Sequence, residues 1–349
     1  MKIVADIGLR GIDKILPLMN GLEFFDINLL ETNEITSYAI KETDILLIRS
    51  QTKIDRLLLS GSNIKWIGSA TAGIDHIDKQ YLKDNGIGWF NASGCNSLSV
   101  CNYVLSCLYV LSSNGLFKKN DTVGILGFGN IGSKLKKILD NLGINNCAYD
   151  PFIRNKYLSE IDDVMNCELL TIHTPLTFEG QFPTQNMINK RYLSLTKSHS
   201  IINTSRGGIV DEKRVLDSHI NYIADVWENE PNPNIASIEK SYIATPHIAG
   251  HSQEGKLNGT IAVLIELMNQ LNLSKDVRAK NIETLKEYVD KKNYKYKSLK
   301  DFYKEYSVIR ESNNFKRRAH CALDKCVDNF SQIRSDHPER NDLVFFDSQ

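Results

Sequence analysis

Short runs of β-branched and aromatic residues alternate with longer amphipathic stretches along most of the chain. The runs have the length and composition of strands. They cover residues 2–6, 45–49, 66–69, 122–127, 169–173, 200–203, 222–225 and 242–244. Some of them are apolar throughout, as strands are when helices cover both faces of a parallel sheet. The alternation predicts an α/β protein built on parallel sheets.

Two longer helices divide this pattern into blocks. One is predicted over residues 96–111, where Asn114-Gly115 would stop it, and the other over residues 254–271. Because they bracket a strand-rich block, we expect that block to be a domain inserted into another one. The expected division is a first domain of residues 1–95 and 251–275, an inserted domain of residues 96–250, and a C-terminal part of residues 276–349. Aromatic side chains in the C-terminal part favour either a small third domain or a partly ordered appendage.

Composition narrows the class of protein. The chain has 349 residues, with 42 Lys plus Arg and 42 Asp plus Glu, so it lacks the positive charge typical of nucleic-acid binders. No apolar run is long enough to cross a bilayer, and the N-terminus is too short and too charged for a signal peptide. The seven cysteines are scattered and odd in number, which favours reduced thiols. We therefore expect a cytoplasmic protein with no metal site, no membrane and no nucleic-acid partner.

The most specific motif is a glycine-rich turn between a predicted strand and a helix, GFGNIG at residues 127–132. Gly127 would permit a tight turn, Gly129 would let the backbone approach a pyrophosphate, and Gly132 would let helix and strand pack closely. The helix N-terminus, entered through Asn130 and Ile131, would supply N–H donors.

An acid at the end of the next strand extends this motif. Asp150 follows the glycines by about 20 residues, where a carboxylate accepts the ribose hydroxyls and repels a 2′-phosphate. The spacing predicts a cofactor site for NAD rather than NADP. The alternative is a tight strand–helix turn without a ligand.

Three polar residues follow late strands, where open α/β sheets bind ligands. They are Arg206, Glu230 and His247. Oxidation of an alcohol needs a base, which suits histidine, and a carboxylate can hold that histidine in its reactive tautomer. Arginine suits a substrate carboxylate because it stays charged and donates two parallel hydrogen bonds. From spacing alone, each of these residues is as compatible with a structural role.

At these positions the chain resembles the D-2-hydroxyacid dehydrogenase family, whose members have an Arg–Glu–His triad. The likeness runs from about residue 2 to residue 271. The segments that carry it include 48–53 (IRSQTK), 69–76 (SATAGIDH), 94–96 (GCN), 173–176 (HTPL) and 249–256 (AGHSQEGK). Beyond residue 271, a further similar segment is 330–340 (FSQIRSDHPER). The last of these is similar to the C-terminal dimerisation domain of one subfamily, which acts on a phosphorylated acid.

The resemblance implies a fold and an activity. The fold has two Rossmann-like or flavodoxin-like parallel-sheet domains, one inserted in the other, plus a small C-terminal dimerisation domain in a homodimer. The activity is NAD-dependent oxidation of 4-phospho-D-erythronate, a step of pyridoxal 5′-phosphate (vitamin B6) synthesis. Arg206 would bind the carboxylate and 2-oxygen, His247 would transfer the proton, and Glu230 would orient His247.

Further contacts carry over from the resemblance. Substrate contacts would be Ser50 and Thr71, while Arg49 or Lys53 would complement the phosphate. Position 251 is His where the subfamily usually has Tyr, and an imidazole can still donate to a phosphate oxygen. The implied cofactor contacts are Gly127, Gly129, Asn130, Ile131, Gly132, Asp150, Thr174, Thr204, Ser205, Arg206, Asp225 and Gly250. His76 and His173 are interpreted as structural or as neighbours of site residues.

Three alternative functions stay open at this point. The first is another enzyme of the family, acting on 3-phosphoglycerate, glycerate or lactate. The second is an NAD-sensing module that binds proteins, like the corepressors that share this fold. The third is a structural homo-oligomer, in which Arg206, Glu230 and His247 would be coincidental.

Overall fold

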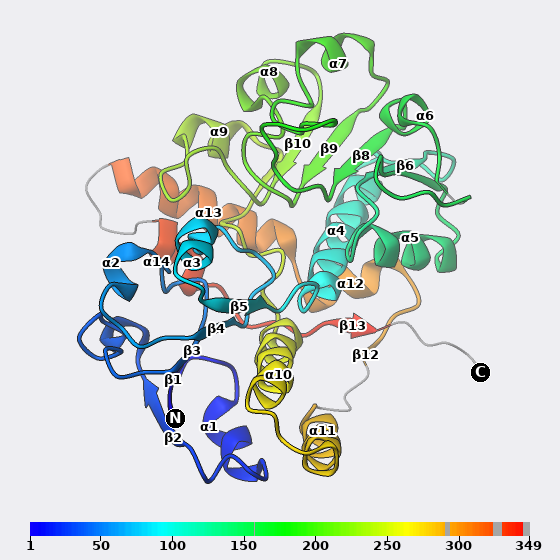
Figure 1. The fold of residues 1–349 in the computed structure, drawn as a ribbon. Helices are drawn as coiled ribbons and strands as arrows, with labels where there is room; N and C mark the ends of the chain where they lie inside the picture. The colour runs from blue at the N-terminus through cyan, green and yellow to red at the C-terminus, as the bar shows by residue number, and fades with distance from the viewer. Residues whose placement is uncertain (157, 290–293, 324–329, 345–349) are drawn as a thin grey trace. The chain divides into compact units, whose positions relative to one another are not determined.

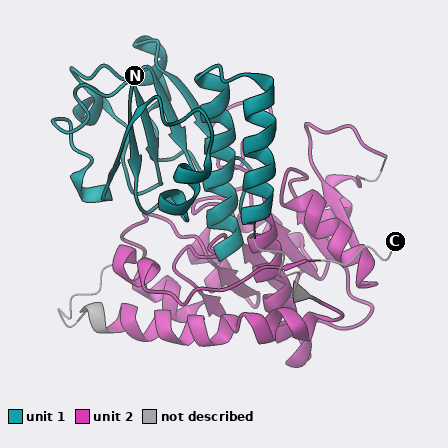
Figure 2. Ribbon diagram, turned by 90° about the horizontal axis from the view of Figure 1, so that it is seen from below, with its two compact units in different colours: residues 1–96, 252–292 teal, residues 97–251, 293–349 magenta. Residues whose placement is uncertain are grey.

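The computed structural model describes residues 1–156, 158–289, 294–323 and 330–344. They divide into two compact units, residues 1–96 with 252–292 and residues 97–251 with 293–349 (Figure 2). Every strand pair in the two larger sheets is parallel. The α/β class predicted from the alternating pattern is therefore confirmed.

The first unit is a five-stranded sheet with its helices, in the strand order β2-β1-β3-β4-β5 (Figure 1). Its elements are β1 (Lys2–Asp6), α1 (Ile12–Ile15), β2 (Asp26–Leu30), β3 (Ile45–Ile48), α2 (Arg56–Leu59), β4 (Trp66–Ser69), α3 (Lys79–Asp84), β5 (Gly88–Asn91), α10 (Gln253–Gln270) and α11 (Lys275–Tyr288), with short 3-10 turns at Leu16–Leu18 and Thr32–Glu34. Helix α10 joins this sheet from far along the chain. A β-carbon on its Gly259 would overlap the carbonyl oxygen of Ala70, so glycine permits this close packing.

The second unit is a six-stranded sheet with the strand order β11-β10-β9-β8-β6-β7. Its elements are α4 (Ser97–Ser113), β6 (Val123–Leu126), α5 (Gly132–Asn141), β7 (Asn146–Tyr149), α6 (Ile161–Met165), β8 (Leu169–Ile172), α7 (Lys190–Leu195), β9 (Ser200–Asn203), α8 (Glu212–Leu216), β10 (Asn221–Ala224), α9 (Ile235–Lys240) and β11 (Ile243–Ala244). Neighbouring residues of β6 enter different apolar clusters: Ile125 packs with Val104 and Leu108 of α4, and Leu126 with Leu170. Both faces of the sheet are thus buried.

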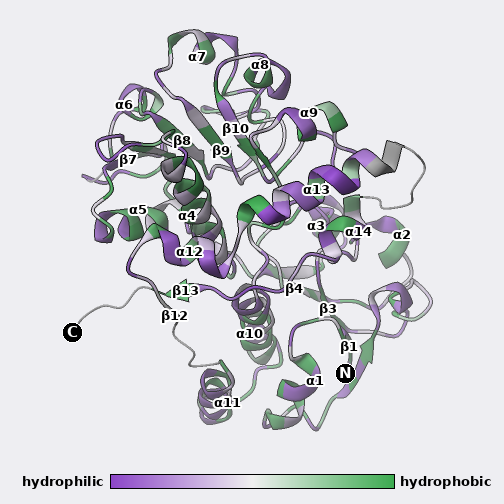
Figure 3. Ribbon diagram, turned by 180° about the vertical axis from the view of Figure 1, so that it is seen from behind, coloured by the Kyte–Doolittle hydropathy of each residue, from purple (hydrophilic) through white to green (hydrophobic). Residues whose placement is uncertain are grey.

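The C-terminal residues pack on this second unit. They form β12 (Tyr294–Lys295), α12 (Leu299–Glu305), α13 (Val308–Leu323), α14 (Phe330–Ser335) and β13 (Leu343–Val344). Phe302 and Tyr306 are part of the apolar cluster that contains α4. Phe315 and Phe330 are part of the other apolar cluster of this unit, which contains Leu126 and Leu170. Helix α13 is otherwise mainly hydrophilic (Figure 3).

The segment expected as one C-terminal part, residues 276–349, is divided in the structure. Helix α11 lies in the first unit, where Leu285 is buried, and the described residues from 294 onward lie in the second. The buried aromatic side chains explain the second assignment, because each fills space within the core of that unit.

The predicted strands agree with the structure to within about one residue at each end. The short β12 and β13 were not predicted, and in the two larger sheets neither were β2 and β5, which both lie at the edges of the first sheet. Each has half-exposed positions in place of a continuous apolar run, which is why the pattern missed them. Among the described residues, no helix has the length and apolar character needed to cross a membrane.

Candidate active site

The last residues of the strands in the second sheet are paired with one another, so the strands end side by side. Tyr149 pairs with Leu126, Leu126 with Ile172, and Ile172 with Asn203. Asn203 pairs in turn with Ala224, which pairs with Ala244. The residues that directly follow this row begin the segments that hold Gly127, Asp150, Thr174, Thr204–Arg206, Asp225–Glu230 and Thr245–His247. The predicted cofactor and triad residues of this unit therefore meet at one edge of the sheet.

The three glycines of the turn differ in their surroundings. Gly127 has a φ of +92°. A β-carbon there would lie 2.6 Å from the carbonyl oxygen of His173. A β-carbon on Gly132 would overlap the carbonyl oxygen of Gly127, whereas one on Gly129 would meet nothing within 4 Å. Gly127 and Gly132 thus allow the strand and helix α5 to pack closely, and Gly129 presents an open backbone to a ligand.

Asp150 is held beside the same turn. Its Oδ2 accepts a hydrogen bond from the N–H of Phe128 (2.9 Å), and its Oδ1 accepts one from the N–H of Phe152 (3.0 Å). Asn130 and Ile131 lead into α5 on the other side of the turn. A carboxylate fixed in this way keeps lone pairs for two adjacent hydroxyls, which fits an adenosine ribose.

The loops after β8 and β9 add polar groups. Thr174 Oγ1 is buried and has no hydrogen-bond partner among the described residues, so it can accept a ligand's donor. Thr204 Oγ1 lies 3.3 Å from His173 Nδ1, and the Ser205 hydroxyl donates to the carbonyl oxygen of Ile172 (2.8 Å). Burial lowers the pKa of His173 to about 3, so this imidazole is neutral at physiological pH. The Thr174 hydroxyl has no partner among the described residues, and the space beside Gly129 is empty. Both features fit the binding of a dinucleotide.

His247 and Glu230 form the centre of the site. His247 Nδ1 lies 2.7 Å from Glu230 Oε2, and Glu230 Oε1 accepts a hydrogen bond from the N–H of Trp227 (2.8 Å). Burial raises the pKa of Glu230, but the hydrogen bond and charge of His247 outweigh burial, so this pKa lies below its ordinary value. The carboxylate is therefore ionised, accepts the Nδ1 proton and leaves Nε2 as the reactive nitrogen.

Asp225 holds the loop that carries His247. Its Oδ1 accepts from the Thr245 hydroxyl (2.7 Å) and from the N–H of Ile248 (2.8 Å), and its Oδ2 accepts from the N–H of Ala249 (2.9 Å). The side chain is buried, and burial raises its pKa. Sequence reasoning placed Asp225 among the cofactor contacts and missed this anchoring role.

Arg206 follows β9, next to the strand that leads to Glu230. Its Nη1 donates to the carbonyl oxygen of Ser205 (2.7 Å). A β-carbon on the next residue, Gly207, would overlap the carbonyl group of Trp227, so the Arg206 loop lies directly against the Glu230 loop. The three triad residues thus come from adjacent strand ends, β9, β10 and β11.

The C-terminal segment reaches the same edge, which sequence reasoning did not predict. Arg340 is buried and donates from Nε to the carbonyl oxygen of His251 (2.8 Å) and from Nη2 to the carbonyl oxygens of Ile248 (3.2 Å) and Ala249. Gly250 lies between these anchored residues. The two arginines of the 330–340 segment were the available signal, but the sequence gives no sign of what they contact.

Arg334 of α14 also faces this region. Its Nη2 lies 3.4 Å from His251 Nε2. Burial lowers the pKa of Arg334, the charges of Glu230 and Asp225 raise it, and the charge of Arg206 lowers it further. These charges therefore act on one another at the same sheet edge.

The candidate substrate residues of the first unit lie after β3 and β4. Ser50 is exposed, and the Thr71 hydroxyl donates to the carbonyl oxygen of Gly73 (3.1 Å). Arg49 is engaged within this unit: its guanidinium pairs with both oxygens of the buried Asp6 (3.0 and 3.1 Å) and with the Thr32 hydroxyl.

Lys53 and His76 are held by contacts within the same unit. Lys53 is exposed and pairs with Asp55 at 3.0 Å. His76 Nε2 bonds the Ser69 hydroxyl (3.0 Å), and burial lowers the pKa of His76. Both contacts are local, so neither residue is held toward a particular ligand.

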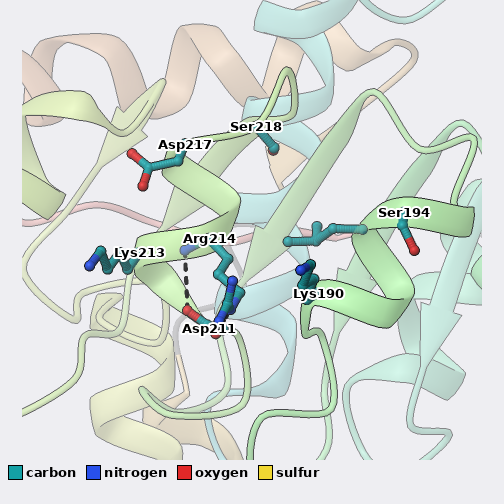
Figure 4. Close-up of a pocket in the computed structure, with 8 residues that line it drawn as sticks. Lys190, Ser194, Asp211, Lys213, Arg214, Asp217 and Ser218 are labelled. Carbon is teal, nitrogen blue, oxygen red and sulfur yellow. Dashed lines mark hydrogen bonds and ion pairs between the residues drawn. The ribbon is translucent and has the colours of Figure 1, made fainter.

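A surface hollow elsewhere on the second unit contains none of the predicted residues. It has a volume of about 430 Å³ and lies between α7 and α8 (Figure 4). Its lining residues are Lys190, Leu193, Ser194, Asp211, Lys213, Arg214, Asp217 and Ser218. Asp211 already has partners within the protein, because it caps the N-terminus of α8 and forms an ion pair with Arg214 (3.0 Å).

The chain is similar to known proteins over most of its length. Residues 112–249 match the family model described as D-isomer specific 2-hydroxyacid dehydrogenase, NAD binding domain. A relative from Ruthia magnifica, named erythronate-4-phosphate dehydrogenase, is 36% identical over 303 residues, 84% of this chain and 88% of the relative. A relative of the same name from Wigglesworthia glossinidia brevipalpis is 41% identical over 256 residues, covering 70% of this chain and 67% of the relative.

Solved structures show the same architecture. An NAD+-bound 3-phosphoglycerate dehydrogenase from Entamoeba histolytica matches with a TM-score of 0.63 at 25% identity, covering 78% of this chain and 96% of that one. A D-lactate dehydrogenase from Aquifex aeolicus, solved with NAD and lactic acid, has a TM-score of 0.59 at 18% identity, covering 82% of this chain and 98% of that one.

Proposed function

Because the chain belongs to the erythronate-4-phosphate dehydrogenases, within the D-isomer-specific 2-hydroxyacid dehydrogenases, we propose that it oxidises 4-phospho-D-erythronate to (3R)-3-hydroxy-2-oxo-4-phosphooxybutanoate. It is an NAD-dependent oxidoreductase. The observation that carries the proposal is the 2.7 Å hydrogen bond between His247 Nδ1 and Glu230 Oε2 beside Arg206. The product would serve pyridoxal 5′-phosphate synthesis, as the names of the relatives imply.

The proposed reaction assigns one task to each triad residue. His247 Nε2 takes the proton of the 2-hydroxyl, and Glu230 stabilises the imidazolium that results. Arg206 holds the substrate carboxylate and the 2-oxygen by paired hydrogen bonds. NAD, when bound, accepts the hydride that leaves C2. The backbone of the turn, with Asp150 and Thr174, would hold that cofactor.

Other assignments are part of the same proposal. Ser50 and Thr71 would contact the substrate, and Thr204, Ser205, Asp225 and Gly250 would support the cofactor. The chain would act as a homodimer through its C-terminal part. It would work in the cytoplasm, in keeping with the free thiols of Cys95, Cys101, Cys107, Cys147 and Cys167.

The test is an assay of NADH formation with 4-phospho-D-erythronate, 3-phosphoglycerate, D-glycerate and D-lactate. We expect the highest kcat/KM with 4-phospho-D-erythronate. His247→Ala should lower kcat at least about 1,000-fold and leave NADH affinity nearly unchanged, because the base is lost and the cofactor site is kept. The matched control is His219→Ala, which removes an exposed histidine of the same unit.

Two results would contradict the proposal. Preference for an unphosphorylated acid or for 3-phosphoglycerate would assign the chain to another activity of the family. Negligible turnover with every acid, together with NAD-dependent binding of a protein, would favour the corepressor-like function instead.

A further inference from the structure

Arg334 is a cation without an acidic partner. Within the described residues no carboxylate oxygen lies within ion-pair distance of its guanidinium, and its side-chain contact is His251 Nε2 at 3.4 Å. Other arginines of the chain differ: Arg318 pairs with Asp336 at 2.8 Å, and Arg49 pairs with Asp6 at 3.0 Å. A half-buried guanidinium with no carboxylate within ion-pair distance is suited to binding an anionic ligand.

The fold fixes Arg334 at the active-site edge of the second unit. Phe330 and Ile333 of the same helix are buried in the cluster that contains Trp227. Phe315 links them, with its ring 6.0 Å from both Trp227 and Phe330. The N–H of Trp227 donates to Glu230. These aromatic contacts therefore connect the helix of Arg334 to the triad.

Two histidines stand beside Arg334. His251 follows the catalytic loop, and its ring lies 5.0 Å from that of His337. His337 Nδ1 bonds the backbone carbonyl oxygen of Arg334 (2.9 Å), which fixes the end of α14. Three nitrogen-bearing side chains from two distant segments thus gather at Arg334, whose charge interacts with those of Glu230 and Arg206.

The proposed substrate has two anionic ends, a carboxylate at C1 and a phosphate at C4. The triad accounts for the carboxylate through Arg206 and leaves the phosphate without a ligand in this unit. We propose that Arg334, assisted by His251, binds the phosphate of the substrate and is a specificity-determining residue. The inference rests on the proposed function, and it assigns a substrate contact to the C-terminal segment.

The experiment compares Arg334→Gln and Arg334→Lys with wild type on 4-phospho-D-erythronate and on unphosphorylated D-erythronate. For Arg334→Gln we expect KM for the phosphorylated acid to rise about 10- to 100-fold, because a charge-assisted hydrogen-bond pair is lost. The kcat for that acid should stay within about threefold, and kcat/KM for D-erythronate within about twofold. Arg334→Lys should recover part of the loss. Arg317→Gln, which removes an exposed arginine of α13, is the matched control.

Inorganic phosphate gives a readout that does not depend on turnover. Its binding to the NADH-loaded protein, measured by calorimetry, should weaken about tenfold or more in Arg334→Gln and not in Arg317→Gln. Unchanged KM and phosphate affinity in Arg334→Gln would overturn the inference, and so would an equal loss on both acids. If wild type does not oxidise 4-phospho-D-erythronate, the proposed function is wrong, and the phosphate titration still decides whether Arg334 binds phosphate.

Discussion

Asp225 and Glu212, two buried carboxylates of the second unit, differ in how their charge is compensated. Asp225 accepts three hydrogen bonds from the loop of His247. Glu212 accepts one from the N–H of Glu228 (2.9 Å). Burial raises the pKa of Glu212 to about 7, and that hydrogen bond offsets the effect only in part. Glu212 therefore keeps a proton in the folded protein that it loses at lower pH in the unfolded chain.

This difference gives a pH-dependent prediction. Between about pH 4.5 and pH 7 the unfolded chain releases the Glu212 proton first, so the free energy of unfolding falls as the pH rises. Glu212→Gln should remove this contribution, which is on the order of 3 kcal/mol for a pKa of about 7. Urea unfolding of both proteins across this range is the measurement. A constant difference between wild type and variant would contradict it, and Glu239→Gln is the control.

At the scale of residues, sequence reasoning found what local spacing encodes. Gly127, Asp150 and His247 each follow a recognisable strand, so their position at one end of the sheet could be predicted from neighbours along the chain, while their chemistry stays a prediction. Arg334 and Arg340 could not, because their roles depend on contacts with residues about 80 to 90 positions away. No local pattern records such a contact.

In the turn between β6 and α5, two glycines have different structural reasons for lacking a side chain. Gly132 permits backbone packing, and Gly129 faces open space. Gly132→Ala should lower the unfolding midpoint by several degrees and abolish NADH binding, because its β-carbon would overlap the carbonyl oxygen of Gly127. Gly129→Ala should unfold like wild type and still bind NADH about tenfold or more weakly, because its β-carbon would occupy ligand space. Thermal unfolding and NADH fluorescence titration measure both effects. Equal stability of the two variants would be evidence against this division of roles.

At the scale of elements, the strands that could be predicted are those buried on both faces of their sheet. The central strands β3, β6, β8 and β9 are buried at every position, and their apolar runs identified them. The edge strands β2 and β5 are partly exposed and carry a mixed pattern. Their strand character comes from pairing with a neighbour, which propensity alone does not predict.

At the scale of the whole molecule, the C-terminal residues belong to the core of the second unit. Phe302 is 1% exposed within that core, whereas Phe178 is 66% exposed. Phe302→Ala should lower the free energy of unfolding by about 3–5 kcal/mol through the cavity it leaves. Phe178→Ala should change it by less than about 0.5 kcal/mol. Calorimetry of the NADH-bound protein measures both. A small loss for Phe302→Ala would mean that the C-terminal residues contribute little to this unit.

The overall division of the chain was harder to predict than its strands. The helices near residues 97 and 253 signal an insertion, because each follows a break in the pattern. The placement of residues 294–323 and 330–344 depends on which core their aromatic side chains fill. Their apolar content does not specify which of the two units supplies that core. Their expected role in dimerisation stays a prediction.

The contacts of Arg340 with the loop that carries His247 also bear on how the protein is made. The two partners lie 89 to 92 positions apart, so a ribosome adds Arg340 about 5–20 s after the loop. During that interval the nascent chain has its triad residues and the Asp225 contacts of the His247 loop, but it lacks the hydrogen bonds from Arg340. Products of premature termination before Arg340 would contain every residue of the triad and still lack one of the side chains that hold the loop of His247.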